Sequence, residues 1–166
     1  MSADVTIRPA ALADLASVRA IVSQAWMASY GPIVGDDKVA GMAAVLLSDI
    51  FLRELITGGR ADTPIAFVGD KAAATAVARR EDNCLHVLRL YVAPRFQRRG
   101  LGVALLAWLA ARQRAELPIR VEAAAANEGA LRFYAREGFT DIGGAREIIG
   151  GVAFDIRRLE RAGRAG

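Results

Sequence analysis

The chain has 166 residues, 54% of them hydrophobic and 24% charged, which excludes an intrinsically disordered protein and suits one globular domain over residues 1–166. Its net charge of +4 is mild, and basic residues gather mainly around positions 95–99 and near the C-terminus, so we expect no nucleic-acid partner. With one cysteine, no apolar run of about 18 residues and no signal-peptide pattern, we expect a cytoplasmic protein that has neither a disulfide nor a membrane partner.

The first third of the sequence predicts one strand and two helices. Residues 5–10 alternate like a short strand, and apolar residues at helical spacing predict a helix over 11–26. Residues 27–37 contain two glycines and a proline, which predict a loop. A second helix is predicted over 38–57, where two glycines end it.

The middle of the sequence predicts an antiparallel meander followed by a buried helix. Three strand-like runs, 64–69, 72–79 and 84–92, are separated by short polar turns. A helix follows over 101–117 and is apolar on nearly every side, which is typical of a helix packed against a sheet. Residues 119–125 then predict another strand.

The last third predicts a short helix and two strands. The helix over 127–138 begins at Asn127, a residue type that favours the N-cap position, and ends at a glycine. Two strands with glycine-rich turns are predicted within 139–161, and residues 162–166 are expected to be a disordered tail. The predicted order βααβββαβαββ indicates a mixed α/β domain.

The segment QRRGLG, residues 97–102, lies between a predicted strand and the start of a predicted helix. The first amide groups of a helix lack partners and attract anions, and Gly100 and Gly102 would let a ligand approach the backbone. Arg98 and Arg99 would add charge-assisted contacts to phosphate. The dinucleotide-binding and Walker patterns do not fit, and the structural alternative is a glycine turn with solvated arginines.

Two segments together resemble the GNAT superfamily of N-acetyltransferases. LYVAPRFQRRGLGVALL matches the acetyl-CoA motif Q/R-x-x-G-x-G/A, and VEAAAANEGALRFYAREGF, about 35 residues further on, resembles the second motif of that superfamily. The resemblance implies a single-domain GNAT-like fold with a mostly antiparallel sheet, split in a V between the fourth and fifth strands. It also implies a bulged fourth strand, acetyl-CoA as co-substrate, and coenzyme contacts from Leu90, Tyr91, Val92, Gln97, Arg98, Arg99, Gly100, Leu101, Gly102, Asn127 and Tyr134.

Direct transfer to an amine needs a base for the ammonium proton and an acid for the departing thiolate. The resemblance makes Tyr134 the predicted acid, with core packing as its structural alternative. Glu122 matches a glutamate position of the ribosomal-protein alanine acetyltransferase branch and is the predicted base, unless it is merely solvated or pairs with Arg120. His86 on the fourth strand is the rival base, and a water chain is a third possibility.

The acceptor side is less well defined by the sequence. Trp26 and Tyr30 flank the segment that shapes the acceptor site in GNAT proteins, and the acidic residues Asp36 and Asp37 hint at a cationic amine. Cys84 and the lone histidine lack further ligands, so we expect no metal.

The resemblance therefore implies an enzyme that transfers acetyl from acetyl-CoA to a primary amine of a small molecule or protein, as a monomer or homodimer. The alternative is a catalytically silent module that binds coenzyme A or acyl-CoA.

Overall fold

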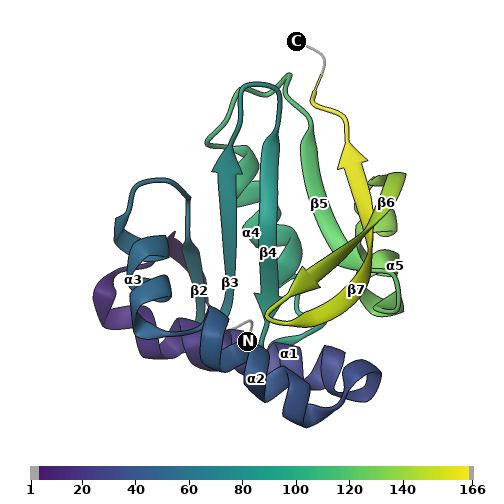
Figure 1. Ribbon diagram of the computed structural model, residues 1–166. Coiled ribbons are helices and arrows are strands. Elements are labelled where there is room, and N and C mark those ends of the chain that lie inside the picture. Colours follow the sequence, from purple (N-terminus) through teal and green to yellow (C-terminus); the bar gives the residue numbers. More distant parts are fainter. Residues whose placement is uncertain (1–3, 165–166) are drawn as a thin grey trace.

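A seven-stranded mixed sheet organises the chain, and the computed structural model describes residues 4–164 (Figure 1). Its strands lie in the order β1-β2-β3-β4-β5-β7-β6, and only the β4–β5 pair is parallel. The strands are β1 (Val5–Pro9), β2 (Pro64–Val68), β3 (Lys71–Arg80), β4 (Leu85–Val92), β5 (Ile119–Ala124), β6 (Thr140–Ile149) and β7 (Val152–Arg161). The helices are α1 (Leu15–Val34), α2 (Asp36–Leu46), α3 (Asp49–Thr57), α4 (Leu101–Ala110) and α5 (Glu128–Arg136), with short 3-10 helices at Leu12–Asp14 and Pro94–Phe96. The predicted α/β class is confirmed.

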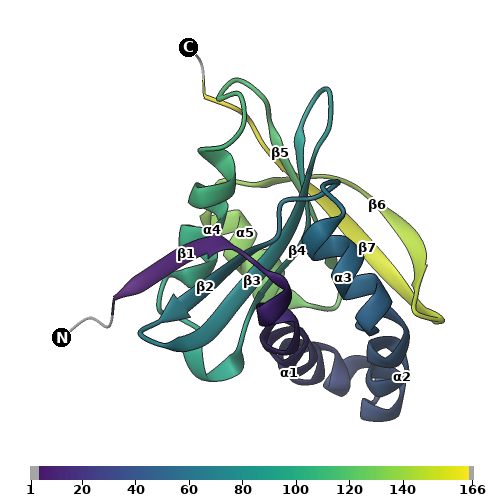
Figure 2. The ribbon, with the colours of Figure 1, turned by 90° about the vertical axis from the view of Figure 1, so that its left-hand side faces the viewer.

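Helices cover both faces of this sheet. Figure 2 shows α4 and α5 on one side of the strands and α2 and α3 on the other. On the α4 side, Leu105, Leu106 and Leu109 are almost completely buried against β3, β4 and β5. On the other side, Trp26 and Met42 belong to a second core. Although α4 is strongly apolar, no helix within residues 4–164 is long and apolar enough to cross a membrane.

The predicted loop at residues 27–37 is wrong, because α1 continues through most of it. Pro32 lies in the last turn of α1, where its missing N–H removes only one helical hydrogen bond. The ring of Tyr30 packs edge-on against the ring of Phe154, with centroids 5.4 Å apart. This contact between distant segments outweighs the local signal for a loop.

The predicted helix over 38–57 is also wrong, because the chain forms two helices there. The break falls at Leu47, which is buried, and Ser48, whose backbone is extended at the N-cap position of α3. Serine followed by aspartate is typical of a helix start, so the sequence did contain this signal. Three helices, rather than the predicted two, therefore separate β1 from β2.

The helix predicted over 101–117 ends earlier, at Ala110. The polar residues beyond it have no apolar face to bury, and the Arg112 guanidinium lies 3.3 Å from the centroid of the Trp108 ring. Further on, the amide of Arg164 donates a hydrogen bond to the Ala115 carbonyl at 2.7 Å. The last two residues of the predicted tail, 165–166, lie outside the described residues.

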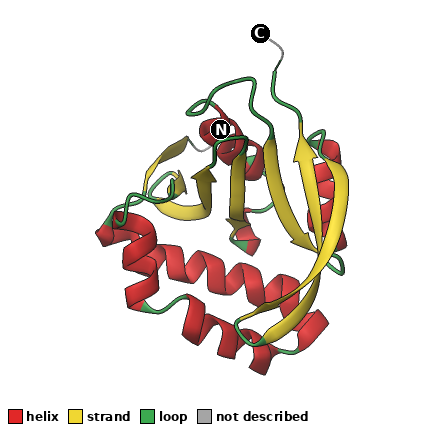
Figure 3. Cartoon of the chain, turned by 45° about the horizontal axis from the view of Figure 1, so that its top comes forward, coloured by secondary structure: helices red, strands yellow, loops and turns green. Residues whose placement is uncertain are grey.

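The β6–β7 hairpin extends beyond the sheet to the helical layer (Figure 3). Gly150 in its turn has a φ of 56° and lies so close to α2 that an added Cβ would be 3.0 Å from Met42 Cα. The hairpin thus closes one side of the space between the sheet and α1, where Phe154 and Ile156 join the second core.

The sheet opens between β4 and β5, as predicted. These strands pair only over Leu85–Val87 and Ile119–Val121, and they diverge towards their C-terminal ends (Figure 1). Beyond the last paired residues, the two strand edges have no strand between them. The predicted V-shaped split is therefore confirmed.

A bulge in β4 lies at the point where the split begins. Val87 faces Ala78 of β3, but Arg89 faces Val77, so Leu88 is an extra residue without a partner on β3. The bulge shifts the alternation of side chains along β4. Arg89 consequently points to the side of α1 and α3, whereas Val87 belongs to the α4 core.

The burial of α4 generates a stability prediction. Leu105→Ala should lower the free energy of unfolding by about 3 kcal/mol, because it leaves a cavity at a fully buried position. Val103→Ala is a matched control on the same helix, since Val103 is 42% exposed, and should change the value by less than about 1 kcal/mol. Urea unfolding followed by circular dichroism measures both, and equal losses would contradict the assigned burial.

Candidate active site

A cleft of about 770 Å³ opens where β4 and β5 diverge. This volume lies within the usual range of small-molecule sites. Its walls come from four places: α1, the bulged part of β4, the segment that leads into α4, and β5 with α5. Of the residues predicted to contact coenzyme, those lining the cleft are Leu90, Tyr91, Val92, Gln97, Arg98, Gly100, Leu101, Gly102, Asn127 and Tyr134.

The start of α4 forms the anion-binding end of this cleft. Gly100 is the N-cap with a φ of 78°, no side chain caps the helix, and a Cβ on Gly100 would meet nothing within 4 Å. The first amides of α4 are therefore open to a ligand. Gln97 holds the segment that leads into α4 against the end of β4, because its Nε2 donates a hydrogen bond to the Val92 carbonyl at 3.3 Å.

Three further residues of the motif, Arg98, Arg99 and Gly102, differ in what they do. Arg98 is the one non-glycine residue with positive φ (63°) in residues 4–164, and its exposed side chain borders the cleft. Arg99 does not line the cleft; its guanidinium lies 5.6 Å from the Phe96 ring centroid. Gly102 allows close packing, since an added Cβ would lie 2.9 Å from Phe133 Cζ.

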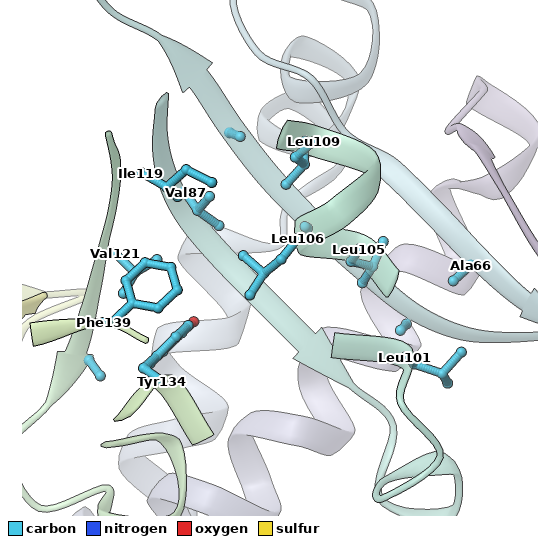
Figure 4. Close-up of a cluster of buried hydrophobic side chains, with 14 of the residues drawn as sticks. Ala66, Val87, Leu101, Leu105, Leu106, Leu109, Ile119, Val121, Tyr134 and Phe139 are labelled. Atoms are coloured by element: carbon cyan, nitrogen blue, oxygen red, sulfur yellow. The ribbon is translucent and has the colours of Figure 1, made fainter. Parts of the chain in front are cut away.

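Tyr134 lies where α5 meets the cleft, and only 6% of the residue is exposed. Its ring packs edge-on between Phe133 and Phe139, with centroid distances of 5.1 and 5.3 Å. Figure 4 shows the ring beside Phe139 among the buried side chains of this core. Burial raises the pKa of the Tyr134 phenol, with a smaller contribution from Tyr91, so the phenol remains protonated at neutral pH.

Asn127 is the N-cap of α5, as predicted. Its Oδ1 accepts a hydrogen bond from the Ala130 amide at 3.2 Å. Because Asn127 also lines the cleft, the cap fixes the start of α5 beside the cleft, and Tyr134 lies in the last turn of the same helix.

Glu122 lies on β5 at the opposite wall of the cleft. Its Oε1 accepts a hydrogen bond from Arg158 Nε at 3.1 Å, and Arg158 also binds Glu147 at 3.2 Å. Within residues 4–164, Glu122 Oε2 has no hydrogen-bond partner. Arg120, the alternative partner, instead binds Glu160 at 2.7 Å.

His86 lies before the bulge and does not line the cleft. Its Nδ1 is 3.2 Å from Glu81 Oε1, and the Cys84 thiol donates to the other oxygen of Glu81 at 3.4 Å. Burial and this glutamate raise the pKa of the Cys84 thiol, which makes it a poor nucleophile. The structure therefore places Glu122 in the cleft and leaves the rival base outside it.

Aromatic residues form the α1 side of the site. Tyr30 lines the cleft, and burial together with Tyr91 raises the pKa of its phenol. Trp26 does not line the cleft; it is buried, lines a separate small pocket of about 40 Å³ together with Tyr30, and packs edge-on against Tyr91 with ring centroids 6.0 Å apart. Neither Asp36 nor Asp37 lines the cleft, so the acidic pair gives no support for a cationic acceptor.

Sequence reasoning missed Arg89, which lines the cleft between Tyr91 and the bulge. Its guanidinium lies 5.7 Å from the ring centroid of Trp26 and 5.2 Å from that of Phe51. Burial lowers the pKa of Arg89, and Tyr91 partly opposes this effect. A charged residue within the apolar run LRLYV was the available signal.

The chain belongs to the acetyltransferase (GNAT) family, whose model matches residues 22–139. PaiA N-acetyltransferase from Thermoplasma acidophilum, solved in complex with coenzyme A, is similar at TM-score 0.77 and 19% identity, covering 96% of this chain and 99% of that chain. A GCN5-related N-acetyltransferase from Rhodopseudomonas palustris is similar at TM-score 0.79 and 19% identity, covering 98% of each chain. The ribosomal-protein-S18-alanine N-acetyltransferase from Escherichia coli is similar at TM-score 0.67 and 21% identity, covering 98% of this chain and 97% of that chain. None of the curated protein sequences matches this chain.

The positive φ of Arg98 generates a second prediction. Arg98→Gly should raise the free energy of unfolding by about 0.5–1 kcal/mol, because glycine adopts this conformation without strain from a Cβ. Arg99→Gly is the neighbouring control and should lower it by about 0.5 kcal/mol, since Arg99 has no positive φ to relieve. Thermal and urea unfolding measure both changes, and a loss of stability in Arg98→Gly would argue against the assigned backbone.

Proposed function

We propose that this protein is an acetyl-CoA-dependent N-acetyltransferase that moves the acetyl group directly to a primary amine of a small molecule or protein. One observation carries the proposal: a single cleft contains an anion-binding helix start at Gly100, a bulged strand at Leu88, a buried Tyr134 and the carboxylate of Glu122. Each of these groups corresponds to one requirement of acetyl transfer to an amine.

The residues of the cleft fit coenzyme A. The open amides after Gly100 suit a pyrophosphate, and Arg98 adds an exposed positive charge beside them. The backbone of Leu90, Tyr91 and Val92 borders the cleft along the diverging edge of β4, where an extended pantetheine arm would find strand-like hydrogen-bond partners. Two proteins of similar structure were solved with such a ligand: the Thermoplasma protein with coenzyme A, and YncA from Salmonella typhimurium with acetyl-CoA. Both complexes support this assignment.

Bound acetyl-CoA supplies a thioester whose carbonyl carbon is the electrophile. Leu88 has no partner residue on β3 at the bulge, and its amide is the proposed donor for the negative charge that develops on the carbonyl oxygen. Glu122 Oε2 accepts one proton from the ammonium and passes it to solvent. Tyr134 gives its proton to the departing sulfur and regains one from the attacking nitrogen. The new N–C bond thus replaces the C–S bond, and the thiol and an N-acetyl amine leave.

The silent coenzyme-binding module is the second candidate. The observation in its favour is the ion pair between Glu122 and Arg158, which occupies one carboxylate oxygen. Calorimetry with acetyl-CoA and a thiol-release assay across a broad amine panel separate the two. Binding without turnover would favour the silent module, whereas thiol release that depends on the amine supports the enzyme.

The proposed acid generates a third prediction. Tyr134→Phe should lower kcat by about 100-fold or more, because the sulfur then departs without a positioned proton donor. The Kd for coenzyme A should stay within about threefold, since the ring packing is retained. Thiol release and calorimetry measure the two quantities, and full activity in this variant would remove Tyr134 from the mechanism.

The proposed base generates a fourth prediction. Glu122→Gln should lower kcat/KM for the amine by about 100-fold, with the largest loss at low pH, where fewer amine molecules are neutral. Glu147→Gln is a matched control, because Glu147 also binds Arg158 but does not line the cleft. Equal losses in both variants would show that the carboxylates only hold Arg158 in place.

A further inference from the structure

Arg89 combines three features that a structural arginine does not need. It lines the cleft, it lies next to the bulge at Leu88, and its guanidinium is held between the rings of Trp26 and Phe51. The two aromatic rings attract the guanidinium and restrict its position. A positive charge is thus fixed beside the place where the acetyl group would be transferred.

Among the described residues, this charge has no carboxylate partner. Within residues 4–164, no carboxylate oxygen lies within 4.0 Å of the Arg89 guanidinium, and its side chain donates no hydrogen bond. By contrast, Arg120 and Arg158, on the neighbouring strands β5 and β7, each bind a carboxylate, at 2.7 and 3.1 Å. Burial lowers the pKa of Arg89, as expected for a cation without compensation. A half-buried arginine without a carboxylate partner favours a ligand that brings the negative charge.

The position of Arg89 distinguishes this ligand group from the phosphates of the coenzyme. Leu90 and Val92 pack towards the α4 core, whereas Arg89 and Tyr91 lie on the opposite face of β4, against α1 and α3. The anion-binding start of α4 is therefore not on the side to which Arg89 points. On β5, Glu122 stands on this same face, because its neighbours Val121 and Ala123 belong to the α4 core.

We infer that the acceptor amine carries a carboxylate, which binds Arg89 while its amino group faces Glu122 across the opening between β4 and β5. The acceptor class is then a primary amine with a carboxylate, as in a free amino acid. One planar guanidinium offers two parallel hydrogen bonds to a carboxylate and balances one negative charge, which fits a carboxylate better than a phosphate dianion. This inference rests on the proposed function for the identity of the second group, the amine.

A binding experiment tests the inference without requiring turnover. Calorimetry on the full chain with coenzyme A present would compare N-acetyl amino acids, which are the expected products, with matched N-acetyl amines that lack the carboxylate. N-acetyl-leucine with N-isopentylacetamide and N-acetyl-phenylalanine with N-phenethylacetamide are two such pairs, in a panel that spans the common side chains. Wild-type protein should bind at least one acid about tenfold or more tightly than its match, and Arg89→Ala should abolish that preference.

The controls separate recognition from folding. Arg89→Lys keeps the charge but loses the planar fork, so it should retain only part of the preference. Arg53→Ala removes an exposed arginine of α3 that does not line the cleft, and it should bind like the wild type. Melting temperatures of all variants show whether the fold persists. If Arg89→Ala does not fold, Arg89→Lys alone decides, because an unchanged preference in that variant would overturn the inference.

Kinetics then separate this inference from the proposed function. Thiol release that is faster with amines than with their amino-acid counterparts would leave the N-acetyltransferase intact and overturn the carboxylate. Carboxylate binding that depends on Arg89, without thiol release, would support a carboxylate site at Arg89 and count against the enzyme. Finally, if Arg89→Ala impairs only the use of succinyl-CoA, the carboxylate belongs to the acyl group and the acceptor assignment is wrong.

Discussion

The bulge at Leu88 is the constraint on which the site depends. A parallel pair of strands with continuous hydrogen bonds would leave no room for a ligand between β4 and β5. The extra residue shifts the register of pairing with β3, which resumes at Arg89, and pairing with β5 ends at Val87, immediately before the bulge. The strands then diverge, and β4 and β5 contribute two of the walls of the cleft. The cleft therefore depends on one irregularity in the central strand β4.

The same interruption decides which side chains meet. Without the extra residue, Arg89 would share a face with Leu85 and Val87 and enter the apolar core. With it, Arg89 turns to the α1 side, onto the face where β5 presents Glu122. A charged residue is therefore compatible with the apolar run of β4 because a backbone irregularity precedes it.

The sequence was most informative where a local interaction fixes the conformation. The start of α4 at Leu101 and the cap at Asn127 depend on residues within one helical turn, and both were predicted correctly. The helical course of residues 27–34 was not, because the contact between Tyr30 and Phe154 joins segments far apart in the sequence. Arg89 was missed for a related reason: its two aromatic neighbours come from α1 and α3, whose places in the fold no local pattern reveals.

The motif at residues 97–102 shows that one pattern can combine different physical requirements. Gly100 needs a positive φ and leaves open space, which suits a bound anion. Gly102 needs neither; it is small because Phe133 of α5 packs against it. That contact connects the anion-binding start of α4 with the helix that carries Tyr134, so the two motifs of the sequence meet in space at one glycine. A side chain at Gly102 would therefore displace α5 and, with it, the proposed acid. The spacing of the motif thus links the proposed coenzyme site to the proposed acid, although each residue obeys only its own local constraint.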